Sequence, residues 1–278
     1  MIDRVGELTA IIESHRCYSH PIFMNWAKVR PAPPVIGALF HQIQCFCAAT
    51  RPGWSFPKSL YELGSAEQAK LLQEIVESEE DHGPELAAMA GHIVNRAAGE
   101  IVFRDLGNQE KVESGLKSFS DGLLSQLPGY DQETGLTVQA RKAIGVFERR
   151  KQAGRDDTLR NLGAALALEV ISNRHLIPGE KHCLVDAGHY GASLDEPEMH
   201  YLLEHWGEVG AESQHERNAI DAVNQSLNDE DRPLIVEGIY EFLDSLCALW
   251  DVLDTALLQS GIAESQLPDS RRPAGQAA

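Results

Sequence analysis

The stretch HWGEVGAESQHERNAI, residues 205–220, carries two carboxylates and an imidazole at helical spacing. Glu208, Glu212 and His215 follow one another at steps of four and then three residues. Each residue turns an α-helix by about 100°, so these steps return to the same face of the helix. Carboxylate oxygens and imidazole nitrogens together suit a divalent transition metal such as iron or manganese. The stretch therefore predicts a helix that carries half of a metal site.

Helical patterns bounded by Pro and Gly cover most of the remaining chain, and no stretch alternates as a half-buried strand would. We therefore predict an all-α fold, with a single helical domain over residues 1–266 and a disordered tail over residues 267–278. Residues 177–197, IPGEKHCLVDAGHYGASLDEP, are predicted to form a long irregular loop. The predicted helices span residues 4–14, 35–49, 65–80, 85–98, 109–126, 136–151, 157–174, 196–228 and 233–259.

Composition narrows the classes of partner. The hydrophobic fraction of 43% and the charged fraction of 24% are typical of a folded globular protein. A formal net charge of −18 would repel a phosphate backbone, so we expect no nucleic-acid partner. No apolar run is long enough for a membrane span and the N-terminus lacks a signal-peptide layout, so we expect a cytoplasmic protein without a membrane partner. Five cysteines without a CxxC pair fit reduced thiols.

Two further segments carry metal-ligating residue types. In EEDHGPELAAMAGH, residues 79–92, Glu85 and His92 are two helical turns apart, and Asp81 lies one turn before Glu85. In NLGAALALEVISNR, residues 161–174, Glu169 is the one ionisable residue between positions 162 and 171. A carboxylate buried in such a stretch must be paired, protonated or metal-bound. An exposed acidic helix face explains the spacing of Glu85 and His92, and that of the 208, 212 and 215 positions, as well as a metal site does. Glu169 differs, because no cationic residue lies at helical spacing from it.

Together the three segments resemble the heme-oxygenase-like diiron oxidases and oxygenases, relatives of the TenA and PqqC proteins. The late-helix motif of that family, His-x3-Asp-x2-His, corresponds here to Glu208-x3-Glu212-x2-His215, with Glu in place of the first His and of Asp. The single central Glu of the family corresponds to Glu169 in AALALEV. The acidic residue and the His of the early helix correspond to Asp81 or Glu85 and to His92.

The resemblance implies a heme-oxygenase-like helical bundle that binds two iron ions, with manganese as the alternative, and no heme. Dioxygen would be the co-substrate, and a small metabolite the partner. The reactions implied are N-oxygenation, oxidative cleavage or decarboxylation of an amino-acid-like or fatty-acid-like substrate. Glu169 would bridge the metals, and the chain could form a homodimer. The ligands implied are Asp81 or Glu85, His92, Glu169, Glu208, Glu212 and His215.

Two hypotheses from other classes stay open. A cofactor-free enzyme of the same fold, TenA-like or PqqC-like, would keep the bundle without the ligands. Its thiaminase-like form needs a nucleophilic cysteine, for which Cys45 with His41 one turn before it is the candidate. A non-catalytic helical interaction protein would instead turn Glu208 and Glu212 toward solvent.

Overall fold

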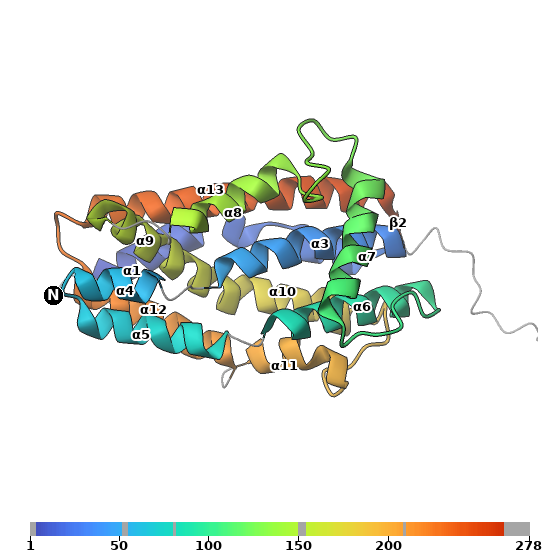
Figure 1. Cartoon of the computed structure of the whole chain (residues 1–278), viewed down its shortest axis with the longest axis horizontal. Coiled ribbons are helices and arrows are strands. Elements are labelled where there is room, and N and C mark those ends of the chain that lie inside the picture. The colour runs from blue at the N-terminus through green and yellow to red at the C-terminus, as the bar shows by residue number, and fades with distance from the viewer. Residues whose placement is uncertain (1–3, 52–54, 80–81, 150–153, 208–209, 264–278) are drawn as a thin grey trace, which may run out of the picture.

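Helices make up almost all of the structure, a computed structural model that describes residues 4–51, 55–79, 82–149, 154–207 and 210–263. They lie side by side in an elongated bundle (Figure 1), so the all-α prediction is confirmed. The predicted tail, residues 267–278, lies outside the described residues. The helices are α1 (Arg4–Ser14), α2 (Ile22–Lys28), α3 (Pro33–Thr50), α4 (Ser55–Glu62), α5 (Ala66–Ser78), α6 (His82–Ala98), α7 (Gln109–Leu124), α8 (Val138–Glu148), α9 (Arg155–Ile171), α10 (Ile177–Lys181), α11 (His200–His205), α12 (Ala211–Ser226) and α13 (Arg232–Ser260).

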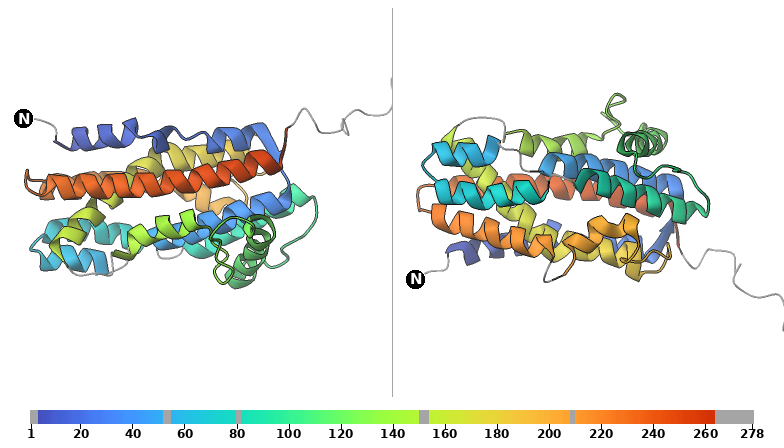
Figure 2. Two further views of the ribbon diagram at one scale, coloured as in Figure 1. Left: turned by 90° about the horizontal axis from the view of Figure 1, so that it is seen from above. Right: turned by 60° about the horizontal axis from the view of Figure 1, so that its bottom comes forward.

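The long helix α13 runs the length of the bundle (Figure 2) and packs closely against α9. Glycines make this approach possible. A Cβ atom at Gly163 would lie 2.0 Å from the carbonyl oxygen of Ile235, and one at Gly238 would lie 1.9 Å from that of Arg160. Both distances are far below contact distance, so the two backbones lie closer than any larger residue would allow.

Other helices complete the bundle around this pair. α3 packs against α6, α7 and α8, and α12 packs against α5 and α9. α7 crosses the remaining helices steeply at one end of the bundle (Figure 1). A two-stranded antiparallel sheet, β1 (Val29–Pro31) and β2 (Gly261–Ala263), joins the end of α2 to the end of α13.

Two predictions about helix continuity are wrong. The helix predicted over residues 196–228 is interrupted between His205 and Ala211, where Gly207 adopts a φ of 92° that no α-helix accommodates. The predicted loop over residues 177–197 is instead helical as far as Asp186. α9 continues through a π-helical turn at Ser172–Leu176 into α10 and then into a second π-helical turn that ends at Asp186.

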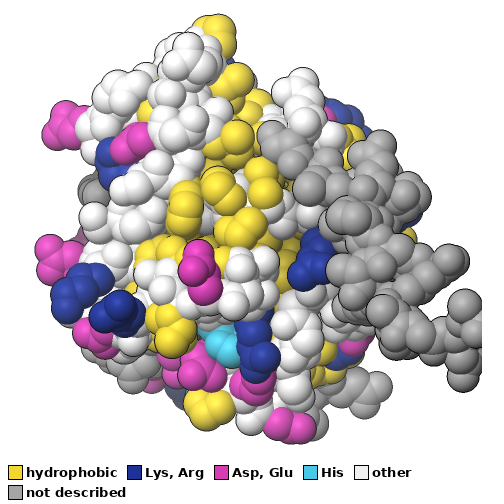
Figure 3. Space-filling view, turned by 90° about the vertical axis from the view of Figure 1, so that its right-hand side faces the viewer, with side chains coloured by type: hydrophobic (Ala, Val, Ile, Leu, Met, Phe, Trp, Pro, Cys, Tyr) yellow, Lys and Arg dark blue, Asp and Glu magenta, His cyan; other side chains and the backbone are white. Residues whose placement is uncertain are grey.

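The surface also carries features that bear on partners. Among the described residues, no helix is both long and apolar enough to cross a bilayer. Hydrophobic side chains gather on the end of the molecule that Figure 3 faces. An open groove beside α7 is lined in part by Val102, Phe103, Val112 and Phe119.

Candidate metal centre

A cavity of about 60 Å³ between the helices has four glutamates in its wall. Helices α3, α5, α6, α9, α10, α11 and α12 all contribute to its walls. Carboxylates enclosed by apolar side chains need a proton, a cation or a metal to balance their charge. The acidic side chains of the wall are Glu79, Glu169, Glu180 and Glu212, and the apolar ones include Phe46, Ile75, Leu86, Leu168, Leu176 and Ile177.

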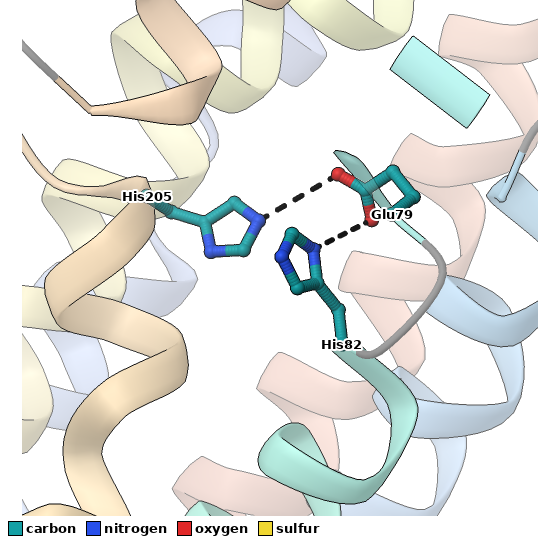
Figure 4. Close-up of side chains that lie close together, drawn as sticks. All are labelled: Glu79, His82 and His205. Carbon is teal, nitrogen blue, oxygen red and sulfur yellow. Dashed lines mark hydrogen bonds and ion pairs between the residues drawn. The ribbon is translucent and has the colours of Figure 1, made fainter. Parts of the chain in front are cut away.

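The first cluster of donor atoms is formed by Glu79, His82 and His205. Glu79 follows the last residue of α5, His82 begins α6, and His205 ends α11. Both imidazoles point toward the Glu79 carboxylate (Figure 4). Its Oε2 lies 3.0 Å from Nδ1 of His82, and its Oε1 lies 3.6 Å from Nε2 of His205. One donor atom from each residue falls within 4.8 Å of the others.

The second cluster of donor atoms shares Glu79 with the first. Oε1 of Glu79 lies 3.5 Å from Nδ1 of His215, and Glu212 on α12 completes this group. Glu169 of α9 approaches the same nitrogen of His215 at 3.7 Å. Glu212 also lies 3.9 Å from Nε2 of His205, which joins the two clusters. Three carboxylates and three imidazoles therefore surround one small volume, with Glu79 between the two groups.

Hydrogen bonds fix which nitrogen of His215 faces the centre. The hydroxyl of Ser78 donates to the carbonyl oxygen of Ile75 at 2.9 Å, and its oxygen lies 2.7 Å from Nε2 of His215. With the single hydroxyl proton directed at the carbonyl of Ile75, Nε2–H of His215 donates to Ser78, and Nδ1 keeps its lone pair. That lone pair faces Glu79 and Glu169.

His205 is oriented in the same manner. Its Nδ1–H donates to the carbonyl oxygen of Tyr201 at 2.6 Å, so Nε2 carries the lone pair toward Glu79 and Glu212. A histidine that binds a metal through one nitrogen commonly donates its other N–H to a carbonyl or another acceptor. Both imidazoles are therefore held in the form that binds metal.

Burial sets the protonation of the centre. Burial, reinforced by the negative charge of Glu169, raises the pKa of Glu212 well above its usual range. Burial raises the pKa of Glu180 to about 7 and lowers the pKa of His215 to about 4. Burial would also raise the pKa of Glu79, but the interactions of its carboxylate with His205 and His82, which are strongest when these imidazoles are protonated, outweigh this effect and lower it. The centre thus holds protons that a metal ion would displace on binding.

The donor set fits a pair of transition-metal ions. Within the described residues, Oε2 of Glu212 and Nδ1 of His215 are buried without a hydrogen-bond partner, which is costly unless another group satisfies them. Mixed carboxylate and imidazole donors suit iron and manganese. Two overlapping groups that share one carboxylate are the arrangement by which helical bundles hold two such ions.

The structure brings together three of the predicted ligands and places the others elsewhere. Glu169, Glu212 and His215 lie in the clusters described above. The predictions for Asp81 and Glu208 fall on residues outside the described ranges. His92 lies instead against Glu196, at 3.0 Å, because it is ten residues beyond the start of α6. Glu85 contacts His200 at 3.0 Å and lies outside both clusters.

Glu79, His82 and His205 supply the donors that sequence reasoning missed. Glu79 and His82 form a Glu-x-x-His pair, the spacing that carboxylate-bridged metal sites use on helices, and this signal was available in the sequence. His205 could not be found by spacing. It lies ten residues before His215, and only the interruption at Gly207 turns both imidazoles toward Glu79.

The cysteine of the cofactor-free hypothesis does not line the cavity. Sγ of Cys45 lies 3.7 Å from Nε2 of His41, but burial raises the thiol pKa to about 11. The thiol therefore stays protonated at neutral pH, whereas a nucleophilic cysteine needs a thiolate. Cys47, which does line the cavity, has its pKa raised further by burial. Glu212 is only 6% exposed, so it does not face solvent as a surface interaction stripe requires.

Comparison with known proteins supports the fold. No protein-family model and no curated protein matches the chain. A crystal structure of a CADD-like protein of unknown function from Nostoc punctiforme PCC 73102 is similar over 90% of this chain and 97% of that one. The two have a TM-score of 0.56 and 15% sequence identity. They share a fold. At this identity the likeness carries no statement about activity.

Proposed function

We propose that this protein is a non-heme diiron oxidase or oxygenase that uses dioxygen to oxidise a small organic substrate. The observation that carries the proposal is the close grouping of three carboxylates and three imidazoles, with Glu79 shared between two groups of donors. The likeness to the CADD-like protein is consistent with the heme-oxygenase-like bundle that the sequence resembles. Manganese is the alternative metal, since the same donors accept it.

The residues divide into two metal positions. Glu79, His82 and His205 would hold one ion, and Glu79, Glu212 and His215, with Glu169 beside them, would hold the other. The shared position therefore falls to Glu79 and not to Glu169, the bridging candidate of the sequence analysis. Two bound ferrous ions would supply the electrons that reduce dioxygen.

The chain itself contributes positioning and the exclusion of water. Ser78 and the carbonyl oxygen of Tyr201 hold the imidazoles of His215 and His205 in fixed orientations. Ser78 lies on α5 and Tyr201 lies on α11, so the packing of these two helices determines how the two imidazoles are oriented. Leu168, Ile177 and the other apolar lining residues form a wall that keeps bulk water away from reactive species.

The implied substrates are amino-acid-like or fatty-acid-like. Apolar walls suit an aliphatic chain, and Arg51 is a cationic residue at the cavity that suits a carboxylate. Hydroxylation at nitrogen, oxidative cleavage and decarboxylation are the outcomes that the family resemblance implies.

Metal analysis followed by reaction with oxygen tests the proposal. Apoprotein reconstituted anaerobically with ferrous ion should bind two ions per chain, and mixing with oxygen should consume oxygen and produce an absorbance transient. The Glu212→Gln variant should fail at both steps. Glu77→Gln serves as the matched control, because Glu77 is exposed and is the penultimate residue of α5. A wild-type protein that binds fewer than two ions under every condition and consumes no oxygen would exclude the proposed function.

A further inference from the structure

The imidazole of His82 also faces a third group of possible ligands, on the side away from Glu79. Nε2 of His82 lies 3.7 Å from Oε2 of Glu204 on α11. Glu85, one turn along α6 from His82, completes the group, and one donor atom from each residue lies within 4.8 Å of the others. His82 therefore belongs both to the inner centre and to an outer cluster.

His200 closes the outer cluster. Its Nδ1 lies 3.0 Å from Oε1 of Glu85, and its Nε2 lies 3.4 Å from Oε1 of Glu204. Exposure of the side chains rises from 10% at His82 through 29% at Glu85 to 43% at Glu204 and 49% at His200. The four side chains thus lead from solvent to the buried imidazole that the inner centre shares.

An open groove of about 470 Å³ borders this cluster at His82 and Glu204. Ser78, His82, Glu204 and Trp206 are among the residues that line it. Oε2 of Glu85 is buried and has no hydrogen-bond partner in the described parts of the chain. The cluster therefore combines an open approach with a carboxylate oxygen that lacks a partner.

We propose that His82, Glu85, His200 and Glu204 form an outer site that captures a divalent transition-metal ion from solvent and passes it to the inner centre through His82. The proposal rests on the proposed function, because it assumes that the inner centre holds such ions. It assigns a purpose to Glu85, His200 and Glu204, which the inner centre leaves unused.

The charges of the outer cluster suit a divalent cation. The cluster contains two carboxylates, and within the described residues the ion pairs of Glu85 and Glu204 are with histidines and not with lysine or arginine. Carboxylate and imidazole donors match the preference of the inner centre, so a single type of ion would suit both. Negative clefts of this kind also raise the local concentration of cations and their association rate.

The hydrogen bond between His82 and Glu79 prepares the imidazole for capture. When Nδ1–H donates to Oε2 of Glu79, the lone pair of His82 lies on Nε2, which faces Glu204. The metal-free protein therefore presents His82 to the outer cluster. Transfer then requires that the ion move from Glu85 and Glu204 to Glu79 and His205, on the other side of the same ring, and that Nδ1 of His82 lose its proton, which Nε2 can take once the ion has left it.

Stopped-flow mixing of the apoprotein with Co²⁺ tests the proposal, since visible absorbance reports Co²⁺ in nitrogen and oxygen ligand fields without oxygen chemistry. The wild-type loading rate should level off as the Co²⁺ concentration rises, because capture precedes transfer. Glu204→Gln and His200→Gln should load about tenfold more slowly. Both variants should still reach the wild-type stoichiometry at equilibrium, measured by elemental analysis.

Controls separate this proposal from simpler explanations. Glu198→Gln removes the same charge at a position six residues before Glu204. Glu198 lies 4.0 Å from Nδ1 of His92 and outside the outer cluster. This variant should load at the wild-type rate. Variants of the outer cluster that load as fast as the wild type would overturn the proposal, and so would an equal slowing in Glu198→Gln. A lower final stoichiometry in Glu204→Gln would instead make Glu204 an inner ligand. If the wild-type protein binds no Co²⁺ at all, the proposed function itself fails.

Discussion

Oε1 of Glu79 lies 3.5 Å from Nδ1 of His215, although Glu79 directly follows α5 and His215 lies on α12. The same oxygen lies 3.6 Å from His205 of α11. One carboxylate thus contacts an imidazole from each of two other helices, and the two groups of donors meet at it. Loss of Glu79 should therefore affect both metal positions together.

Glu79→Gln should abolish the binding of both ions. The amide keeps the size of the side chain but removes the negative charge that the two positions share, so neither retains a full set of charged donors. Elemental analysis after reconstitution should show two ions per wild-type chain and fewer than one per variant chain.

Glu77→Gln is the control for Glu79→Gln, because Glu77 is exposed and accepts a hydrogen bond from Gln73 at 2.9 Å. It should bind as many ions as the wild type. Retention of both ions by Glu79→Gln would show that Glu79 does not lie between the metals.

Ser78→Ala should weaken metal binding without unfolding the protein. The hydroxyl of Ser78 accepts the Nε2–H of His215 and so directs the lone pair on Nδ1 into the centre. Loss of an orienting partner of this kind typically costs about tenfold in metal affinity or more. Titration of the apoprotein with Mn²⁺, followed by electron paramagnetic resonance, should show one of the two ions bound about tenfold more weakly.

Ser59→Ala provides the matched comparison for Ser78→Ala. The hydroxyl of Ser59 donates to the carbonyl oxygen of Ser55 within α4, and among the described residues no histidine is hydrogen-bonded to it. This variant should bind Mn²⁺ as the wild type does. Equal affinities in Ser78→Ala and the wild type would mean that helix packing alone orients His215.

Local pattern predicts much of the helical fold. The helix over residues 4–14 is found with the predicted bounds, and the pattern over residues 35–49 lies within α3. Apolar periodicity reports which face of a helix is buried, and that face is set by the residues of the helix itself. The interruption between α11 and α12 was missed because a run of helix-compatible residues hides the positive φ of Gly207.

The candidate site was predictable only in part, because some of its residues meet through contacts between distant segments. Glu169 stands out because a lone carboxylate in an apolar helix is costly wherever the helix packs. His92 shares the spacing of a ligand with Glu85, yet tertiary packing places it against Glu196. His205 reaches Glu79 only because α11 packs on α6 and α12, and contacts between distant segments leave no mark on local spacing.

Acid should destabilise the protein through His41. Burial, aided by the positive charge of Lys117, lowers the pKa of His41 to about 4. The unfolded chain binds this proton near pH 6.5, whereas the folded protein resists it until about pH 4. Protonation of His41 therefore does not reduce the free energy of unfolding above pH 6.5. It reduces that free energy progressively as the pH falls from 6.5 toward 4.

Urea unfolding at pH 7.5 and pH 5 measures the contribution of His41. The linkage relation gives a loss of about 2 kcal/mol between these two pH values from this group. His41→Gln accepts no proton, so the difference between its stabilities at pH 7.5 and pH 5 should be smaller by about that amount. An unchanged difference would show that other groups, such as His215, account for the acid sensitivity.

Gly238→Ala should destabilise the bundle at the contact between α9 and α13. The added Cβ would lie 1.9 Å from the carbonyl oxygen of Arg160, and backbone on both sides leaves no flexible side chain to move aside. Overpacking of this kind costs about 2 kcal/mol or more, which exceeds the gain in helix propensity of about 1 kcal/mol. Gly145→Ala on α8 is the control, since nothing lies within 4 Å of its Cβ. Gly145→Ala should raise the free energy of unfolding by about 0.5 kcal/mol. Urea unfolding should therefore show Gly238→Ala less stable and Gly145→Ala more stable than the wild type. If both variants are more stable, the close backbone contact is contradicted.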